Sequence, residues 1–189
     1  MLHFHDSLQG RGLVNKNLLS DSVLDGFVAC AHGLADKAGA MLRAQRADPA
    51  SLAGFESKDD LSPVTAFDRA VEASMRSRIA DTFPAHGILG EEFPPTQLDA
   101  EFVWAIDPID GTKQFIVGVP VYGTLISLTQ AGRPILGIID HPVTHERWVG
   151  VAGRRSTLNG APIATRRCGR IGDALMSCSN AESIPAAQR

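Results

Sequence analysis

The chain has 189 residues and a formal net charge of -3, with 44% hydrophobic and 21% charged residues. This composition is that of an ordinary globular protein. It shows neither the basic surface of a nucleic-acid partner nor an apolar run long enough to span a membrane. The three cysteines have no C-x-x-C spacing, which indicates reduced thiols and a cytoplasmic protein.

An amphipathic helix is predicted near the start of the chain. Residues 1–20 contain no apolar signal core and are expected to form a loose arm. From Asp21 to Leu42, apolar residues recur at spacings of three and four, which places them on one stripe of a helix that ends near residues 46–49. Ser20 or Asp21 is expected to cap this helix, which we interpret as a packing element without chemistry of its own.

A second amphipathic helix is predicted between Asp68 and Pro84. Val71, Met75 and Ile79 share its apolar face, and Pro84 ends it. Asp68 is a candidate N-cap, because its carboxylate can accept a backbone N–H at the helix start. A capping carboxylate is held in place and can still contact a neighbouring group, so a functional role for Asp68 stays open.

Carboxylates follow two short predicted strands. Residues 86–95 contain an apolar strand that ends in Gly90, Glu91 and Glu92, and the strand Phe102–Ile106 is followed by Asp107 and Asp110. Each motif alone is typical of surface charge or of a solvated turn. Side by side, the two strand ends would gather carboxylates that repel one another unless cations neutralise them, which indicates a divalent-metal site.

The residues around the second acidic pair predict a rigid turn. Pro108 fixes its own φ and lacks an N–H group, so the chain is expected to leave the strand there. Gly111 permits a tight bend, and Thr112 is expected to cap a short helix within Lys113–Val119. Backbone N–H groups at a helix start suit a phosphate, so metal ions and a phosphate are predicted to meet here.

The remaining segments predict an antiparallel meander with a hairpin turn at residues 131–134. Its expected strands are residues 121–129, 135–140, 146–151 and a short one at 163–165.

Histidines and arginines outside the acidic motifs are further candidates. His3, His5, His86, His141 and His145 could bind a metal or carry protons, although a lone histidine is more often surface or core filler. Arg154 and Arg155 could attract an anion, and a solvated loop is the simpler interpretation of that pair.

The acidic motifs resemble those of the inositol monophosphatase superfamily of Mg²⁺-dependent phosphatases. The resemblance rests on Gly90-Glu91-Glu92, on the run from Trp104 to Thr112, and on a third block from Lys58 to Asp68, in matching order and spacing. Three further stretches look most like the histidinol-phosphate phosphatase branch; they are residues 118–125, 132–137 and 141–147.

The resemblance implies an α+β fold, a layered α/β/α/β sandwich in which a helix pair packs on an antiparallel sheet. The expected divisions are a loose arm at 1–20, a phosphatase domain at 21–165 and a remnant of a C-terminal α/β part at 166–189. The family continues into a second half that supplies a further metal-binding Asp, and no Asp in that context occurs here. The sequence therefore predicts a C-terminally truncated member with an incomplete second half.

The resemblance also implies residue roles. The metal ligands would be Glu91, Asp107, the carbonyl of Ile109, and Asp110. Thr112 would pair with Asp68 to orient a water molecule beside the metal-bearing Glu91, and the amides of Gly111 and Thr112 would hold the phosphate. Lys58 and Asp60 would lie in a mobile loop that binds a weaker third metal, with Glu92 behind Glu91 as a supporting residue.

The implied activity is a Mg²⁺-dependent phosphomonoesterase acting on histidinol phosphate, an intermediate of histidine biosynthesis, with two or three Mg²⁺ ions or with Mn²⁺. Inositol phosphates and 3′-phosphoadenosine nucleotides remain alternative substrates, because the motifs serve the phosphate and not the alcohol. We expect a homodimer without nucleic-acid or membrane partners. A non-catalytic metal-binding fragment is the alternative of another class.

Overall fold

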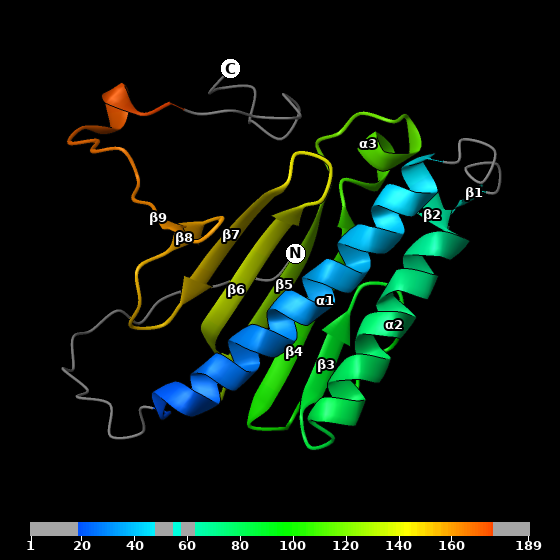
Figure 1. Cartoon of the computed structure of the whole chain (residues 1–189), viewed down its shortest axis with the longest axis horizontal. Coiled ribbons are helices and arrows are strands. Elements are labelled where there is room, and N and C mark those ends of the chain that lie inside the picture. The colour runs from blue at the N-terminus through cyan, green and yellow to red at the C-terminus, as the bar shows by residue number, and fades with distance from the viewer. Residues whose placement is uncertain (1–18, 48–54, 58–62, 176–189) are drawn as a thin grey trace, which may run out of the picture.

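The computed structural model describes residues 19–47, 55–57 and 63–175 of the chain (Figure 1). Its helices are α1 (Asp21–Ala47), α2 (Ala66–Thr82), the short α3 (Thr112–Ile116) and the 3₁₀ turn η2 (Ile171–Asp173). Its strands are β1 (Phe55–Ser57), β2 (Pro63–Thr65), β3 (Gly87–Gly90), β4 (Phe102–Asp110), β5 (Gly123–Gln130), β6 (Arg133–His141), β7 (Glu146–Val151), β8 (Thr157–Leu158) and β9 (Ala161–Pro162).

A seven-stranded sheet with the order β3-β4-β5-β6-β7-β8-β9 forms the centre of the molecule, and β1 pairs separately with β2. The strands from β4 to β9 form the expected antiparallel meander, whereas β3 runs parallel to β4. The prediction of a purely antiparallel sheet was therefore wrong at one edge. The predicted strand at 163–165 was also wrong, since the last two strands lie earlier, at Thr157–Leu158 and Ala161–Pro162.

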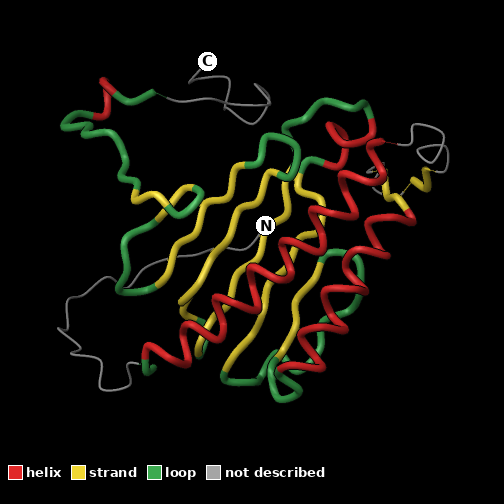
Figure 2. Tube along the Cα trace, viewed as in Figure 1, coloured by secondary structure: helices red, strands yellow, loops and turns green. Residues whose placement is uncertain are grey.

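Helices α1 and α2 cover one face of this sheet (Figures 1 and 2). Helix α1 buries Leu24, Phe27, Leu34 and Leu42 from the predicted stripe, and the Ser20 hydroxyl accepts a bond of 3.4 Å from the Val23 N–H at its start. Helix α2 buries the predicted Val71, Met75 and Ile79. The helix pair packed on a sheet is confirmed, and no described helix is both long and apolar enough to cross a bilayer.

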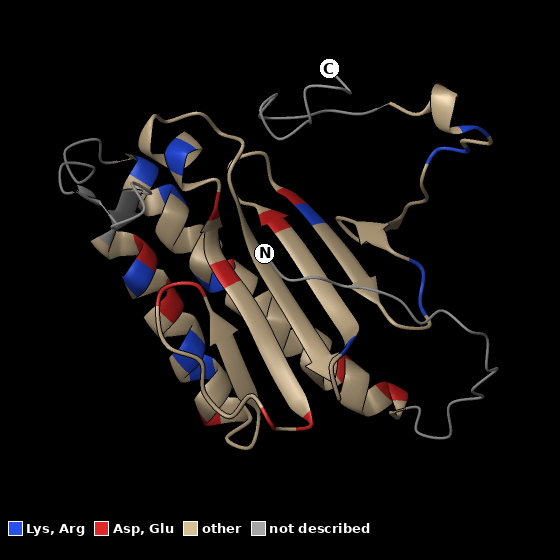
Figure 3. Cartoon of the chain, turned by 180° about the vertical axis from the view of Figure 1, so that it is seen from behind, with Lys and Arg blue, Asp and Glu red and all other residues tan. Residues whose placement is uncertain are grey.

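The opposite face of the sheet carries no described helix (Figure 3). Strand register places Asp107, Leu125, Ile139 and Trp148 in one row across this face. Leu89 and Ile139 are each 46% exposed here. A shallow cavity of about 590 Å³ lies on this face and includes Glu91 and Asp107 in its lining. The acidic motifs thus open onto the uncovered side of the sheet.

Three local predictions differ from the structure. Helix α2 begins at Ala66, so Asp68 lies inside its first turn and is not the N-cap. The N-cap of α3 is Gly111, at φ 88°, and Thr112 is the first helical residue. Strand β4 continues through Pro108 to Asp110, with an irregular register after Asp107, so the chain does not leave the sheet at the proline. Proline has no N–H to donate to a regular ladder, and the bulge accommodates Pro108 because a residue in a bulge needs no ladder hydrogen bond.

Candidate active site

The two acidic motifs lie side by side because β3 and β4 are parallel. Gly90, the last residue of β3, is paired with Ile106 in β4. The next residue of each strand is acidic, so Glu91 and Asp107 leave the same edge of the sheet together. The adjacency expected from the sequence is confirmed at this edge.

Asp107 is in the electrostatic field of two other carboxylates. Burial, together with the negative charges of Glu91 and then Asp110, raises the pKa of Asp107 to about 7. A hydrogen bond between the Asp107 and Glu91 carboxyl groups acts in the same direction, because protonated Asp107 can donate to Glu91. The Ile109 N–H, 3.1 Å from Asp107 Oδ1, opposes the shift. We call Glu91, Asp107 and Asp110 the acidic cluster.

The bulge beyond Asp107 arranges backbone oxygens next to the acidic cluster. The Pro108 carbonyl accepts a bond of 2.8 Å from the buried Thr124 hydroxyl, which fixes the bulge from β5. The Ile109 carbonyl accepts a bond of 3.0 Å from the Thr112 hydroxyl, and the Ile109 side chain is buried. The chain then turns at Gly111 into α3, where any side chain would have to adopt the same left-handed φ.

The acidic cluster has the donor chemistry of a Mg²⁺ site. Three carboxylates supply hard oxygen ligands, and burial of Asp107 together with the charges of Glu91 and Asp110 raises the pKa of Asp107 to about 7, so that a proton or a cation is favoured there. Among the residues that the structure describes, no three His, Cys, Asp or Glu side chains form a group that could hold a metal as it stands. The acidic cluster therefore fits Mg²⁺ in the type of its ligands.

Asp68 and Thr112 were predicted to form a pair. Asp68 is buried in α2, at 3% exposure, and the Thr112 hydroxyl donates to the Ile109 carbonyl. The Asp68–Thr112 pair thus stays a prediction. Lys58 and Asp60, the predicted loop residues, lie outside the described residues, as do His3 and His5.

A contact that the sequence reading missed supports Glu91 and Glu92 from behind. Glu72 of α2 is completely buried, and its carboxylate accepts a 2.7 Å bond from the Glu92 backbone N–H. Arg76 pairs with the same carboxylate at 2.7 Å. The only sequence signal for this contact is the i, i+4 spacing of Glu72 and Arg76, which is also common on solvated helix faces.

The predicted histidines occupy different environments. His86 lies in an aromatic cluster and accepts a bond of 3.1 Å from Trp104 Nε1, so it belongs to the core. His141 lies on the open face against Trp148, and a Cβ on Gly123 would lie 3.3 Å from its Nε2. His145 is exposed, at φ 59°. None of these three rings belongs to the acidic cluster.

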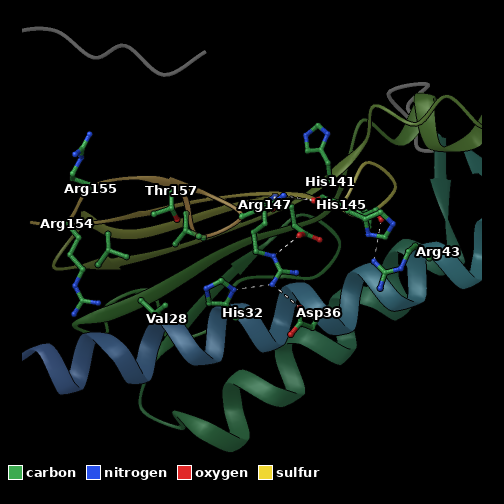
Figure 4. Close-up of a pocket in the computed structure, with 16 residues that line it drawn as sticks. Val28, His32, Asp36, Arg43, His141, His145, Arg147, Arg154, Arg155 and Thr157 are labelled. Carbon is green, nitrogen blue, oxygen red and sulfur yellow. Dashed lines mark hydrogen bonds and ion pairs between the residues drawn. The ribbon is translucent and has the colours of Figure 1, made fainter. Parts of the chain in front are cut away.

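A second cavity, of about 570 Å³, lies between α1 and strands β6 to β8 (Figure 4). We call it the α1–β7 groove. Arg147 crosses it and pairs with Asp140 at 2.7 Å and with Asp36 at 2.9 Å, and its Nη1 lies 3.1 Å from His32 Nδ1. Arg154, a candidate anion attractor, instead pairs with Asp25 at 2.6 Å and with Asp21 at 3.1 Å. Arg147 and Arg154 are therefore each paired with two aspartates.

Comparison with known proteins relates most of the chain to one family. A family model described as inositol monophosphatase family matches residues 24–188. The chain is 46% identical over 160 residues to the bifunctional phosphatase IMPL2, chloroplastic, of Arabidopsis thaliana, covering 84% of this chain and 45% of that protein. It is 40% identical over 122 residues to the histidinol-phosphatase of Mycobacterium tuberculosis, covering 61% of this chain and 47% of that protein.

A solved structure has the same fold. An inositol monophosphatase from Zymomonas mobilis, 43% identical in sequence, superposes with a TM-score of 0.63 over 76% of this chain and 54% of that chain. The chain spans about half the length of the relatives it matches.

Proposed function

The chain belongs to the inositol monophosphatase family, and from this premise we propose that it acts as a Mg²⁺-dependent phosphomonoesterase whose substrate is histidinol phosphate. The observation that carries the proposal is the parallel pairing of β3 with β4, which places Glu91 and Asp107 at adjacent strand ends, and the raised pKa of Asp107 supports it. The similarity to a histidinol-phosphatase supports the choice of substrate.

The side chains of Glu91, Asp107 and Asp110 would hold the metal, with the Ile109 carbonyl as a further oxygen donor. When bound, Mg²⁺ lowers the pKa of a water molecule and neutralises charge on the phosphate. The buried Asp68 and the Thr112 hydroxyl would orient the attacking water. The N–H groups of Gly111 and Thr112, at the start of α3, would donate to phosphate oxygens where negative charge develops.

The test is phosphate release from histidinol phosphate by the wild-type chain and by Asp107→Asn. The asparagine keeps an oxygen for the Ile109 N–H and removes the charge that would hold the cation. We expect turnover to fall by about 10³-fold or more, since charge stabilisation is usually the largest catalytic term. Equal turnover by the two proteins would remove Asp107 from the mechanism.

The same assay separates the alternative functions. Inositol phosphates and 3′-phosphoadenosine nucleotides belong in the panel, because the acidic cluster would hold the metal that serves the phosphate and carries no information about the alcohol. A wild-type chain that binds Mg²⁺ in a calorimetric titration and hydrolyses no ester would instead be a non-catalytic metal-binding fragment.

A further inference from the structure

Glu91 leaves the sheet from its edge strand. Within the described residues, strand β3 forms a ladder with β4 on one side, has a single bridge from Ile88 to Thr96 on the other, and ends at Gly90. Beyond that residue the backbone of Glu91 and Glu92 has left the β3–β4 ladder. Backbone N–H groups that leave a ladder near the core need other acceptors, because an unsatisfied donor is costly. The position of Glu91 therefore depends on contacts from outside the sheet.

Helix α2 supplies those contacts through a carboxylate. Glu72 is 0% exposed; its Oε2 accepts the Glu92 N–H at 2.7 Å, and its Oε1 accepts Arg76 Nε at 2.7 Å. Hydrogen bonds to an ionised acceptor are about twice as strong as neutral ones. Both oxygens of Glu72 are thus engaged inside the protein, and neither is available to a substrate.

Two arginines of α2 extend the attachment along the same segment. Arg76 Nη2 donates to the Phe93 carbonyl at 3.0 Å, and Arg69 Nη1 donates to the Glu92 carbonyl at 3.2 Å. The guanidinium groups of Arg69 and Arg76 lie 4.5 and 5.8 Å from the centre of the Phe93 ring. The backbone that follows Glu91 is therefore held at consecutive residues.

Gly90 makes this close approach possible. A Cβ at residue 90 would collide with the Glu72 carboxylate and would lie 2.8 Å from Arg76 Nη2. The glycine is required by space and not by an unusual φ, since it is absent from the positive-φ glycines of the described chain. Gly90 and Glu72 therefore form one contact, in which the helix carboxylate rests against the bare backbone of the strand end.

We propose that Glu72 is a positioning residue for the metal site. Its buried carboxylate holds the turn at Glu92 and so directs the Glu91 side chain toward Asp107. The inference rests on the proposed function for the identity of the cation. Residues that orient metal ligands in this way commonly change metal affinity by about 10- to 100-fold when they are replaced.

The test compares Glu72→Gln with wild type in a calorimetric Mg²⁺ titration of the full chain. Glutamine preserves the size of the side chain but offers one oxygen acceptor and an NH₂ donor, so it cannot accept from both the Glu92 N–H and Arg76. We expect the Mg²⁺ dissociation constant to rise about 10-fold or more. Saturating Mg²⁺ should return phosphate release close to the wild-type rate, a split that simple loss of fold would not produce.

Two further variants keep the test decisive. Gly90→Ala disturbs the same contact from the strand side while it retains the Glu72 charge, and it should weaken Mg²⁺ binding in the same direction if Glu72→Gln fails to fold. Asp81→Asn removes an exposed carboxylate at the far end of α2 and should leave the titration unchanged.

The outcomes separate this inference from the proposed function. Wild-type Mg²⁺ affinity in folded Glu72→Gln or Gly90→Ala would overturn the positioning role. A wild-type chain that binds Mg²⁺ but hydrolyses no phosphate ester would contradict the phosphatase proposal alone, because the titration would still report the effect of Glu72.

Discussion

The acidic cluster and the α1–β7 groove both gather charged side chains, but they balance charge differently. In the groove, Arg147 lies between two aspartates, so opposite charges meet at 2.7 and 2.9 Å. In the acidic cluster, like charges meet, and burial together with the charges of Glu91 and Asp110 raises the pKa of Asp107 to about 7. The arginines nearest the Glu91 strand end, Arg69 and Arg76, donate to backbone carbonyls and to Glu72.

This difference in charge balance indicates which of the two regions needs a ligand. The pairs of Arg147 are complete within the protein: Arg147–Asp140 links β7 to β6, and Arg147–Asp36 links β7 to α1. A half-buried carboxylate such as Asp107, with two more carboxylates beside it, is incomplete without a proton or a metal ion, and this is the usual condition of a functional site. The size of a cavity does not reveal this contrast, because the two cavities have similar volumes of about 570 and 590 Å³.

The largest effect on stability is expected from Arg147→Ala, which removes the positive charge that pairs with Asp36 and Asp140 in the groove. The Asp140 side chain is only 7% exposed, and the substitution would leave its charge without a partner. We expect a loss of about 2–3 kcal/mol in the free energy of unfolding, measured by urea denaturation. The Mg²⁺ dissociation constant should not change; a change would mean that the two regions are coupled.

A control for this prediction is the double variant with Asp140→Asn. Removing the charge that Arg147→Ala leaves behind should recover part of the lost stability, since a neutral amide is cheaper to bury than a carboxylate. Absence of any recovery would show that the arginine stabilises the groove through its packing.

At the acidic cluster, a substitution is expected to raise the stability of the metal-free protein, by less than Arg147→Ala lowers it. The folded chain raises the pKa of Asp107 from 3.8 to about 7, so metal-free stability is highest at low pH and is lost as the pH rises through that window. At pH 8, Asp107→Asn should therefore melt about 2–4 °C above metal-free wild type, and the gap should close toward pH 4.

Added Mg²⁺ should make the wild type, and not Asp107→Asn, the protein with the higher Tm at pH 8. Bound only by the folded wild type, it should raise the wild-type Tm at pH 8 and leave that of Asp107→Asn unchanged. Thermal melts with and without Mg²⁺ check both statements. An Asp107→Asn variant that is less stable than metal-free wild type at pH 8 would contradict the repulsion inferred for the cluster.

The smallest effect is expected from Arg154→Ala. This arginine pairs with Asp21 and Asp25, but both aspartates are largely exposed, so solvent screens the attraction. We expect Tm to change by less than about 2 °C. A larger drop would show that exposed pairs at the start of α1 also help to hold the helix on the sheet.

Much of the fold follows from local patterns in the sequence. The stripe from Leu24 to Leu42 specifies α1, and the turn at Ala131 and Gly132 joins the predicted strands of the meander. The parallel direction of β3 could not be derived this way, because hydrophobic alternation carries no information about strand direction. The irregular register at Pro108 also escaped prediction, since it depends on Thr124 of the neighbouring strand.

In the candidate site, too, some residues could be predicted from the sequence and others depend on contacts between distant segments. Glu91 and Asp107 could be predicted because their motifs end adjacent strands and resemble those of a known family. Glu72 could not, because its role depends on how α2 rests against the end of β3. The role of Thr112 in the site stays a prediction, and its hydroxyl bond to the Ile109 carbonyl could not be predicted because it depends on the bulge in β4.

The two tryptophans lie on opposite faces of the sheet, and this gives the protein two distinct intrinsic fluorophores. Trp104 is fully buried under the helices beside His86, so its emission should be blue-shifted and should report whether the helix layer remains attached. Trp148 lies in the row that contains Asp107 on the uncovered face, where quenching by added iodide should follow access to that surface. Replacing each indole by phenylalanine in turn would assign the two signals.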